Sequence, residues 1–280
     1  MKYLPILSVS VCALLLSACV IVTPDITVNK KEVLVTTERP KNIIMIVADG
    51  MGPAYTSAYR YYADDPSTPN LDNTFFDQWH IGNSSTYPAT ISGLVTDSAA
   101  SATALSAGVK SYNGAIGLDV NKQPVTTVLH RAKSKGMKTG LAVTSQIVHA
   151  TPAAYVAHNE SRRNYNAIAD SFFDDRLNGQ FKVDVMLGGG TDYFIREDRD
   201  LTAEFRAEGY KYIDEYAQLK SLDTKGGALG LFAPTGLPWA ADDTNPLRLK
   251  DMTQTAIRLL ENSQGYFLLL EASQVDWAGH

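Results

Sequence analysis

The sequence predicts an α/β protein of three layers, in which helices cover both faces of a central, mostly parallel sheet. Short apolar runs alternate with longer segments of helical character throughout residues 41–280. The runs Ile43–Ala48 and Tyr266–Leu270 are apolar at every position, which is typical of parallel strands buried on both faces. The chain has 280 residues, 45% of them hydrophobic, so one large domain has ample apolar content for its core.

The expected strands and helices alternate along the chain from Lys41 onwards. The strands are predicted at Ile43–Ala48, Thr139–Thr144, Val183–Leu187, Leu229–Ala233 and Tyr266–Leu270. The helices are predicted at Met51–Tyr62, Ala99–Ala107, Val125–Lys135, Asn164–Leu177, Leu201–Glu208 and Lys250–Asn262. In the last helix Met252, Ala256 and Leu260 recur at helical spacing, so this helix is expected to cover one face of the sheet.

Two segments between these elements need a separate interpretation. Gly188–Gly190 follows a predicted strand and could be a phosphate-binding loop, but no Lys follows it, so a tight turn between strand and helix is the favoured interpretation. Residues 220–248 are rich in Gly, Pro, Asp and Thr. We expect them to form a surface excursion near the edge of the site.

The N-terminus has the pattern of a targeting segment. The apolar stretch Leu4–Leu16 is too short for a typical transmembrane helix, and Leu16–Cys19 resembles a bacterial lipoprotein processing site. Residues 1–19 are therefore predicted to be a lipoprotein-type signal peptide that ends at Cys19, and residues 20–40 a tether to the domain 41–280. A plain secretory signal, cut nearby, is the alternative.

Cysteine content and net charge limit the cellular location and the partners that we expect for the protein. The only cysteines are Cys12, which would leave with the predicted signal, and Cys19, so we expect the mature domain to have no disulfide. The predicted protein is exported to the periplasm or the cell surface, where acyl chains on Cys19 anchor it to a membrane. The net charge of −5, with a pI of about 5.5, argues against nucleic acid as a partner.

The segment Val95–Thr103 places a serine at a predicted helix start. Ser98 follows Asp97 and precedes a run of small residues that tolerate a helix. Backbone N–H groups and the positive end of a helix dipole favour a phosphate there, and hence a phosphoserine. An ordinary helix N-cap is the alternative for this segment taken alone.

Two carboxylates follow the first and the last of the predicted strands along the chain. Asp49 lies where Ile43–Ala48 ends, and ligands of open α/β sheets bind outside the carboxyl ends of strands. Glu271 ends the last strand, and Asp276 and His280 follow at a spacing of four, which suits a divalent metal on one face of a helix. A turn aspartate and a solvated helix start are the alternatives.

Together, these three segments resemble the alkaline phosphatase family in their motifs and in their order along the chain. The resemblance covers residues 41–280. It implies an alkaline phosphatase-like fold and a metal-dependent phosphomonoester hydrolase that forms a phosphoserine intermediate at Ser98. It further implies two Zn²⁺ and one Mg²⁺ as cofactors, small-molecule phosphomonoesters as substrates, inorganic phosphate as product, and a homodimer as the common assembly.

The resemblance assigns a metal-binding role to several residues. One zinc would bind the Ser98 oxygen with Asp49 among its ligands and lower the pKa of that hydroxyl. Asp49 would also reach toward a magnesium site formed with Thr151 and Glu271. Without the resemblance, a Thr before Pro is a routine loop residue.

The same resemblance places the second zinc at Asp276 and His280, on the side of the leaving group. His149 stands where some members carry Asp and others His, and its role toward the metal is direct, through water, or absent. Trp277 stands where other members carry Lys or His, so it would remove a contact to phosphate through water.

An arginine completes the implied site. Arg162 matches the arginine that clamps phosphate in this family, because a bidentate guanidinium fits two phosphate oxygens. Its neighbour Arg163 is the competing choice, and solvated surface charge is the alternative for both. Asp97 is expected to orient Arg162 through an ion pair.

The family pattern continues beyond His280 with further metal ligands, so this chain is expected to be a fragment that is weakly active or inactive alone. A non-catalytic lipoprotein that binds phosphate or metal, and a phosphodiesterase of the same superfamily, are the alternative functions. A sulfatase is excluded because Ser98 precedes Ala99-Ala100-Ser101 and lacks the Pro and Arg that a sulfatase motif requires.

Overall fold

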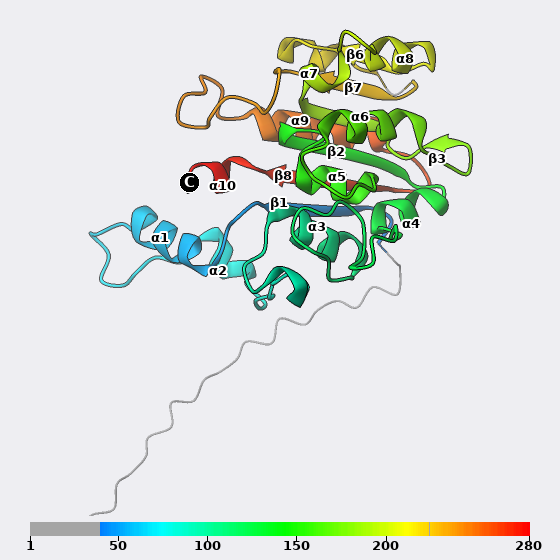
Figure 1. The fold of residues 1–280 in the computed structure, drawn as a ribbon. Helices are drawn as coiled ribbons and strands as arrows, with labels where there is room; N and C mark the ends of the chain where they lie inside the picture. The colour runs from blue at the N-terminus through cyan, green and yellow to red at the C-terminus, as the bar shows by residue number, and fades with distance from the viewer. Residues whose placement is uncertain (1–39, 224) are drawn as a thin grey trace, which may run out of the picture. The chain divides into compact units, whose positions relative to one another are not determined.

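A single parallel sheet forms the centre of the fold in the computed structural model, which describes residues 40–223 and 225–280 (Figure 1). Its six strands lie in the order β1-β8-β2-β5-β7-β6, and every neighbouring pair is parallel. The strands are β1 (Ile43–Ala48), β2 (Lys138–Gln146), β5 (Val185–Gly189), β6 (Lys211–Ile213), β7 (Ala228–Leu231) and β8 (Tyr266–Ala272). A separate antiparallel hairpin contains β3 (Arg176–Leu177) and β4 (Gln180–Phe181).

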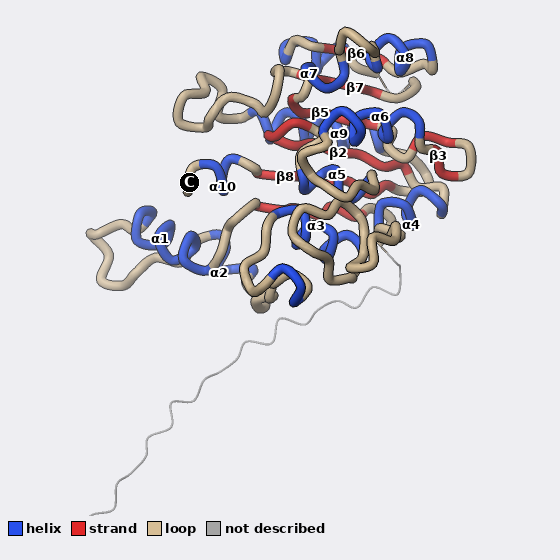
Figure 2. Tube along the Cα trace, viewed as in Figure 1, coloured by secondary structure: helices blue, strands red, loops and turns tan. Residues whose placement is uncertain are grey.

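Helices join these strands and cover the sheet (Figure 2). They are α1 (Pro53–Ala63), α2 (Phe75–Trp79), α3 (Ser98–Ala107), α4 (Val128–Ser134), α5 (Ala150–Val156), α6 (Tyr165–Asp174), α7 (Thr191–Phe194), α8 (Leu201–Ala207), α9 (Arg248–Leu260) and α10 (Gln274–Trp277). Two 3₁₀ turns are Thr90–Ser92 and Tyr216–Ser221. No helix in the described residues is long and apolar enough to cross a membrane.

The predicted three-layer α/β/α class is confirmed by how β8 divides its side chains. Phe267 and Leu269 belong to the core on the side of α4, α5, α6 and α8. Leu268 and Leu270 belong to a second core, which α9 covers. Alternate residues of a strand point to opposite faces, so an apolar residue at every position requires a helix layer on each side.

Strand β1 corrects one expectation. The run Ile43–Ala48 forms the predicted strand, but it is not fully buried: Ile43, Ile44 and Ile46 are 46%, 41% and 68% exposed. Among the described residues, β1 pairs on one side only, with β8. A strand at the edge of a sheet has fewer neighbours to cover its side chains.

Several predicted boundaries are wrong, and local hydrogen bonds explain them. The helix expected to start at Val125 starts at Val128, because the Thr127 side chain caps it by accepting from His130 N. The helix expected to reach Leu177 ends at Asp174, because Arg176–Leu177 pairs in the β3–β4 hairpin. The strand predicted from Val183 starts at Val185, after Asp184 N donates to the Thr139 carbonyl.

Other bounds differ by one or two residues. The structure has Lys138–Gln146 for Thr139–Thr144, Ala228–Leu231 for Leu229–Ala233, Tyr266–Ala272 for Tyr266–Leu270, Pro53–Ala63 for Met51–Tyr62, Ser98–Ala107 for Ala99–Ala107, Leu201–Ala207 for Leu201–Glu208 and Arg248–Leu260 for Lys250–Asn262. The helices α2, α5 and α7 and the strands β3, β4 and β6 were not predicted. All of them are shorter than the windows in which periodicity is distinct.

The glycine run after β5 forms a tight turn. Gly188 and Gly189 end the strand, and Gly190, at φ 115°, turns the chain into α7. A Cβ at Gly189 would lie 1.8 Å from the Thr235 carbonyl oxygen, so the segment after β7 passes directly against this turn. Glycine is therefore needed here for close packing of two backbones.

Candidate active site

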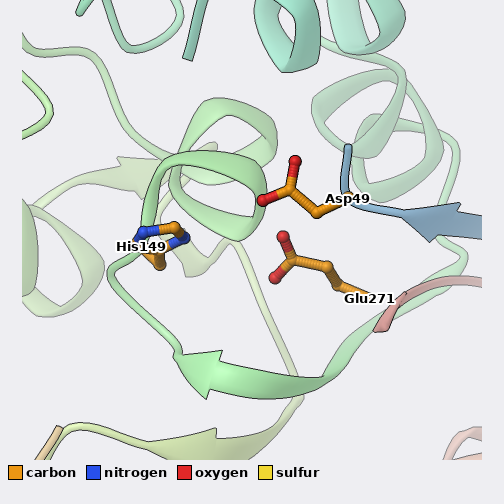
Figure 3. Close-up of side chains that lie close together, drawn as sticks. All are labelled: Asp49, His149 and Glu271. Carbon is orange, nitrogen blue, oxygen red and sulfur yellow. The ribbon is translucent and has the colours of Figure 1, made fainter. Parts of the chain in front are cut away.

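Three polar side chains converge where the neighbouring strands β1, β8 and β2 end (Figure 3). Asp49 directly follows β1, Glu271 lies near the end of β8, and His149 begins the turn into α5 after β2. One ligand atom from each lies within 4.8 Å of the other two, and all three side chains are buried. Parallel strands bring their carboxyl ends to one edge, which is why residues far apart in sequence meet there.

Ser98 lies against Asp49 in this cluster. Its Oγ donates toward the Asp49 carboxylate, at 3.1 Å from Oδ1 and 3.2 Å from Oδ2. Ser98 is the first residue of α3, and the preceding Asp97 is its N-cap, accepting from Ala100 N at 2.9 Å. The hydroxyl therefore stands at the positive end of a ten-residue helix, beside a carboxylate.

Arg162 joins the cluster through two contacts. Its Nη1 lies 3.2 Å from Asp97 Oδ2, and its Nη2 donates to His149 Nε2 at 3.1 Å. Asp97 Oδ2 also accepts from Gly114 N, which fixes the carboxylate that holds the guanidinium. Arg163 is exposed and takes no part in these contacts. Of the two arginines considered from the sequence, Arg162 is the one that lies at the site.

The contact with Arg162 fixes the protonation of His149. A guanidinium only donates hydrogen bonds, so Nε2 must be the unprotonated ring nitrogen and the ring proton lies on Nδ1. Burial, together with the charge of Arg162, lowers the pKa of His149 to about 4. Nδ1 is buried and has no hydrogen-bond partner. In this arrangement His149 supports Arg162, and it would have to release Arg162 Nη2 to bind a metal through Nε2.

Glu271 carries the most unfavourable buried charge of the site. Its side chain is fully buried; Oε2 accepts from Ser145 Oγ at 2.8 Å, whereas Oε1 has no partner. Burial raises the pKa of Glu271 to about 7, and the nearby charge of Asp49 adds to the rise, while Thr151 and Ser145 oppose it. Thr151, 1% exposed, lies in the first turn of α5, not in a loop.

The pKa of Asp49 is raised as well, by burial and by the charge of Asp276, and the hydrogen bond from Ser98 acts against this. Two adjacent buried carboxylates strongly favour a cation between them. Glu271 Oε1 accepts no hydrogen bond. The atoms that could bind a metal here are carboxylate oxygens, hydroxyl oxygens and one imidazole nitrogen. Such a set suits a divalent cation, so the residues present fit the metal that the sequence predicted.

The last two predicted ligands lie in and after α10, beside the turn that follows Asp49. Asp276 Oδ1 would lie 2.3 Å from a Cβ at Gly50, a residue at φ +65°, so only glycine fits beside it. His280 Nε2 lies 3.3 Å from Asp276 Oδ2. This pair is more open to solvent than the Asp49 cluster, because the His280 side chain is 76% exposed.

Two contributors to the site were not predicted from the sequence. Ser145 hydrogen-bonds Glu271, and Gly50 makes room for Asp276. Ser145 directly follows the predicted strand Thr139–Thr144, where a single small polar residue carries no distinctive signal. Gly50 follows a strand and an aspartate, which identified a turn but not the neighbour that the turn admits.

In the described part of the chain, fold and site together define an α/β protein with a candidate divalent-metal centre and a serine hydroxyl at the carboxyl ends of parallel strands. The chain belongs to the alkaline phosphatase family, because the family model described as Alkaline phosphatase matches residues 40–280.

Individual relatives agree with this membership. Alkaline phosphatase 3 of Bacillus subtilis (strain 168) is 51% identical over 243 residues, a match that covers 86% of this chain and 52% of the relative. Alkaline phosphatase 4 of the same organism is 46% identical over 284 residues, covering 100% of this chain and 60% of the relative. The chain thus spans about half to three-fifths of the length of these two relatives.

A solved structure supports the fold. The cold-active alkaline phosphatase from a psychrophilic Shewanella sp. superposes with a TM-score of 0.79 at 53% sequence identity, over 85% of this chain and 58% of that chain. The alkaline phosphatase from the Antarctic bacterium TAB5 superposes with a TM-score of 0.72 at 29% identity, over 86% of this chain and 67% of that chain. Both similarities place the three-layer arrangement within this family.

Proposed function

We propose that the protein that carries this chain hydrolyses phosphomonoesters through a phosphoserine at Ser98, with divalent metal ions as cofactors. The observation that carries this proposal is the contact of the Ser98 hydroxyl with the Asp49 carboxylate at the start of α3, with Arg162 held by the adjacent Asp97. The proposal includes two Zn²⁺ and one Mg²⁺, inorganic phosphate as product, and a homodimer as the assembly, as the resemblance implies.

The chemistry assigned to the chain has two displacements. Ser98 Oγ loses its proton to solvent and attacks phosphorus; a new P–O bond forms, the ester P–O bond breaks, and the alcohol leaves with a proton from solvent. Water then attacks the phosphoserine, which restores the Ser98 hydroxyl and releases inorganic phosphate. Arg162 holds two phosphoryl oxygens with its fork of donors, and Asp97 keeps the guanidinium in place.

The metal-binding residues divide among three ion sites in this proposal. Asp49, Thr151 and Glu271 would hold magnesium, Asp49 and Ser98 would share one zinc, and Asp276 and His280 would contribute to the other. These ions, when bound, would supply positive charge that lowers the pKa of the serine hydroxyl and offsets charge on the phosphoryl oxygens. A variant of the TAB5 alkaline phosphatase in which a histidine is replaced by aspartate holds Mg in its M3 site, so a magnesium site occurs among the relatives of this chain.

Hydrolysis of para-nitrophenyl phosphate tests the proposal. We expect the metal-loaded protein to release nitrophenol, and a chelator to reduce the rate to background, because both the nucleophile and the leaving oxygen need the cations. Zinc and magnesium together should restore the rate. Turnover that survives complete chelation would contradict the metal-dependent mechanism. A clear preference for bis(para-nitrophenyl) phosphate would instead identify a diesterase, and absence of both activities a non-catalytic binding protein.

Arg162→Ala should raise the Michaelis constant and weaken inhibition by inorganic phosphate, because the variant loses charge-assisted hydrogen bonds to the phosphoryl oxygens. A loss of roughly 1.5–3 kcal/mol per hydrogen bond corresponds to about 10- to 150-fold in affinity. Steady-state kinetics with phosphate as a competitive inhibitor measures it. Arg163→Ala is the matched control, since that side chain is exposed and lies outside these contacts. If Arg163→Ala weakens phosphate binding and Arg162→Ala does not, the assignment is off by one residue.

Export and anchoring form a second part of the proposal, and they concern residues outside the described part of the chain. We expect Cys19 to be the acylated N-terminus of the mature protein, with residues 20–40 as the tether, because Leu16–Cys19 ends the apolar leader. Mass spectrometry of protein expressed in a bacterium should find the lipid on Cys19, and detergent should be needed for extraction. Cys19→Ser should abolish both. A soluble product cleaved beyond residue 19 would refute this expectation.

A further inference from the structure

Two tryptophans outside the catalytic cluster lie against each other beside it. Trp277, in α10, directly follows Asp276, and its ring lies edge-on to the His149 ring, with centroids 6.0 Å apart at 88°. The ring of Trp239 lies 6.1 Å from that of Trp277. His149 in turn contacts Arg162. A continuous series of side chains therefore runs from the guanidinium outwards through His149 and Trp277 to Trp239.

The segment that carries Trp239 is fixed to the edge of the site. This segment, here called the Trp239 loop (residues 232–247), joins β7 to α9 and lies at the same end of the sheet as α10 (Figure 1). Leu237 N donates to the Thr144 carbonyl of β2 at 3.0 Å. On α10, Gln274 accepts from Ala240 N at 3.2 Å and donates to the Leu237 carbonyl at 3.3 Å. The sequence predicted a surface excursion here, and these bonds hold it against the site.

The two tryptophan rings differ in how much of their surface is exposed to solvent. Trp277 is packed from several directions, because a Cβ at Gly236 would lie only 2.2 Å from its ring, and His149 and Trp239 lie against it. Trp239 is 54% exposed. Trp239 is therefore the ring of the pair that presents an indole face to solvent, at a position that the hydrogen bonds of the loop fix.

The position of these rings relates them to the organic part of a substrate. In the proposed reaction the phosphoryl group lies between Ser98 and Arg162, and attacking and leaving oxygens are roughly in line, so the organic group must point away from Ser98. Helix α10 borders the cluster at two points, through Asp276 beside Gly50 and through Trp277 beside His149. A group that extends over α10 meets Trp277 first and Trp239 beyond it.

We propose that Trp239 and Trp277 form an aromatic wall that contacts the leaving group, so that phosphomonoesters of aromatic alcohols are preferred over those of small aliphatic alcohols. This inference rests on the proposed function and adds its substrate class. A planar ring on the substrate can pack against an indole face and gain more than its buried area alone supplies. A small polyol phosphate has no such surface, and it would leave Trp239 in water.

The test measures kcat/KM of the metal-loaded protein for 1-naphthyl phosphate and for glycerol 2-phosphate. For each ester, the value of a variant is divided by that of wild type, so that the intrinsic reactivity of the two esters cancels. Trp239→Ala should lower kcat/KM for the naphthyl ester by roughly threefold to tenfold, chiefly through KM, as expected for loss of one aromatic contact. Glycerol 2-phosphate should change less than twofold and so reports that the variant is folded. Trp239→Phe should keep most of the preference, and Leu247→Ala, an exposed apolar residue of the same loop, should behave as wild type.

The outcomes separate this inference from the proposed function. If wild type hydrolyses both esters and Trp239→Ala slows both equally, or neither, the wall does not contact the leaving group and the inference is wrong while the function stands. A change in oligomeric state without a change in the naphthyl-to-glycerol ratio would also overturn it, since Trp239 would then be covered by a second copy. A wild-type protein that hydrolyses neither ester overturns the proposed function, and the inference with it.

Discussion

Ser98→Ala should abolish turnover of para-nitrophenyl phosphate, with a loss in kcat on the order of 10³-fold or more. Loss of a nucleophilic serine has at least this effect in other hydrolases that form a covalent intermediate. The expectation rests on the position of Ser98 Oγ, which is in contact with both oxygens of Asp49 and stands at the N-terminus of α3. Rapid acid quenching of the wild-type reaction, followed by mass spectrometry, should locate a phosphate on Ser98 itself.

Ser101→Ala is the matched control for this change. Its hydroxyl lies one turn further along α3 and donates to the backbone carbonyls of Asp97 and Ser98, so its removal leaves the catalytic cluster in place. We expect less than about a threefold change in kcat, in line with the small net contribution of one such hydrogen bond. Metal content should be unchanged in Ser101→Ala and largely retained in Ser98→Ala, which removes one proposed ligand of one zinc and leaves Asp49 in place. A fully active Ser98→Ala protein, or a phosphate found on Ser101, would show that the nucleophile is assigned to the wrong residue.

The sheet was predictable because its central strands carry a signal that does not depend on their partners. A strand buried on both faces must be apolar at every position, and Tyr266–Leu270 meets this condition in sequence and in structure. The same rule misjudged Ile43–Ala48, which is equally apolar but half-exposed at the edge of the sheet. Apolar content shows that a strand could be buried, whereas its neighbours decide whether it is.

The part of the candidate site that lies at the carboxyl ends of strands was predictable. Asp49 and Glu271 each follow or end a strand, and parallel pairing of β1 with β8 brings them together. The contact of Arg162 with His149 could not be predicted, because the loop that carries Arg162 has no periodicity from which its path can be derived. The position of Trp239 depends in the same way on hydrogen bonds between the Trp239 loop and α10, which no local pattern encodes.

Glu271→Gln should make the metal-free protein more stable and remove its response to magnesium. Glu271 is fully buried, Oε1 has no partner, and Asp49 lies beside it, so without a cation the charge is costly to bury. Gln keeps the shape and an acceptor for Ser145 Oγ, and its amide can donate toward Asp49. We therefore expect the chelated variant to melt above chelated wild type. Differential scanning calorimetry at a fixed pH above 8 measures this.

With magnesium present, we expect wild type to melt above Glu271→Gln, the reverse of the order in chelator. A metal that binds only the folded state stabilises it by about 2.7 kcal/mol at 100 times its dissociation constant, and Glu271→Gln lacks the charge that attracts the ion. Wild type should thus gain several degrees on titration with magnesium, while the variant stays unchanged and loses most of its phosphatase activity. Glu261→Gln, an exposed carboxylate after α9, is the control for a general effect of charge and should respond as wild type does. A variant that still gains stability from magnesium would show that the ion binds elsewhere, and that Glu271 is buried for a reason other than metal binding.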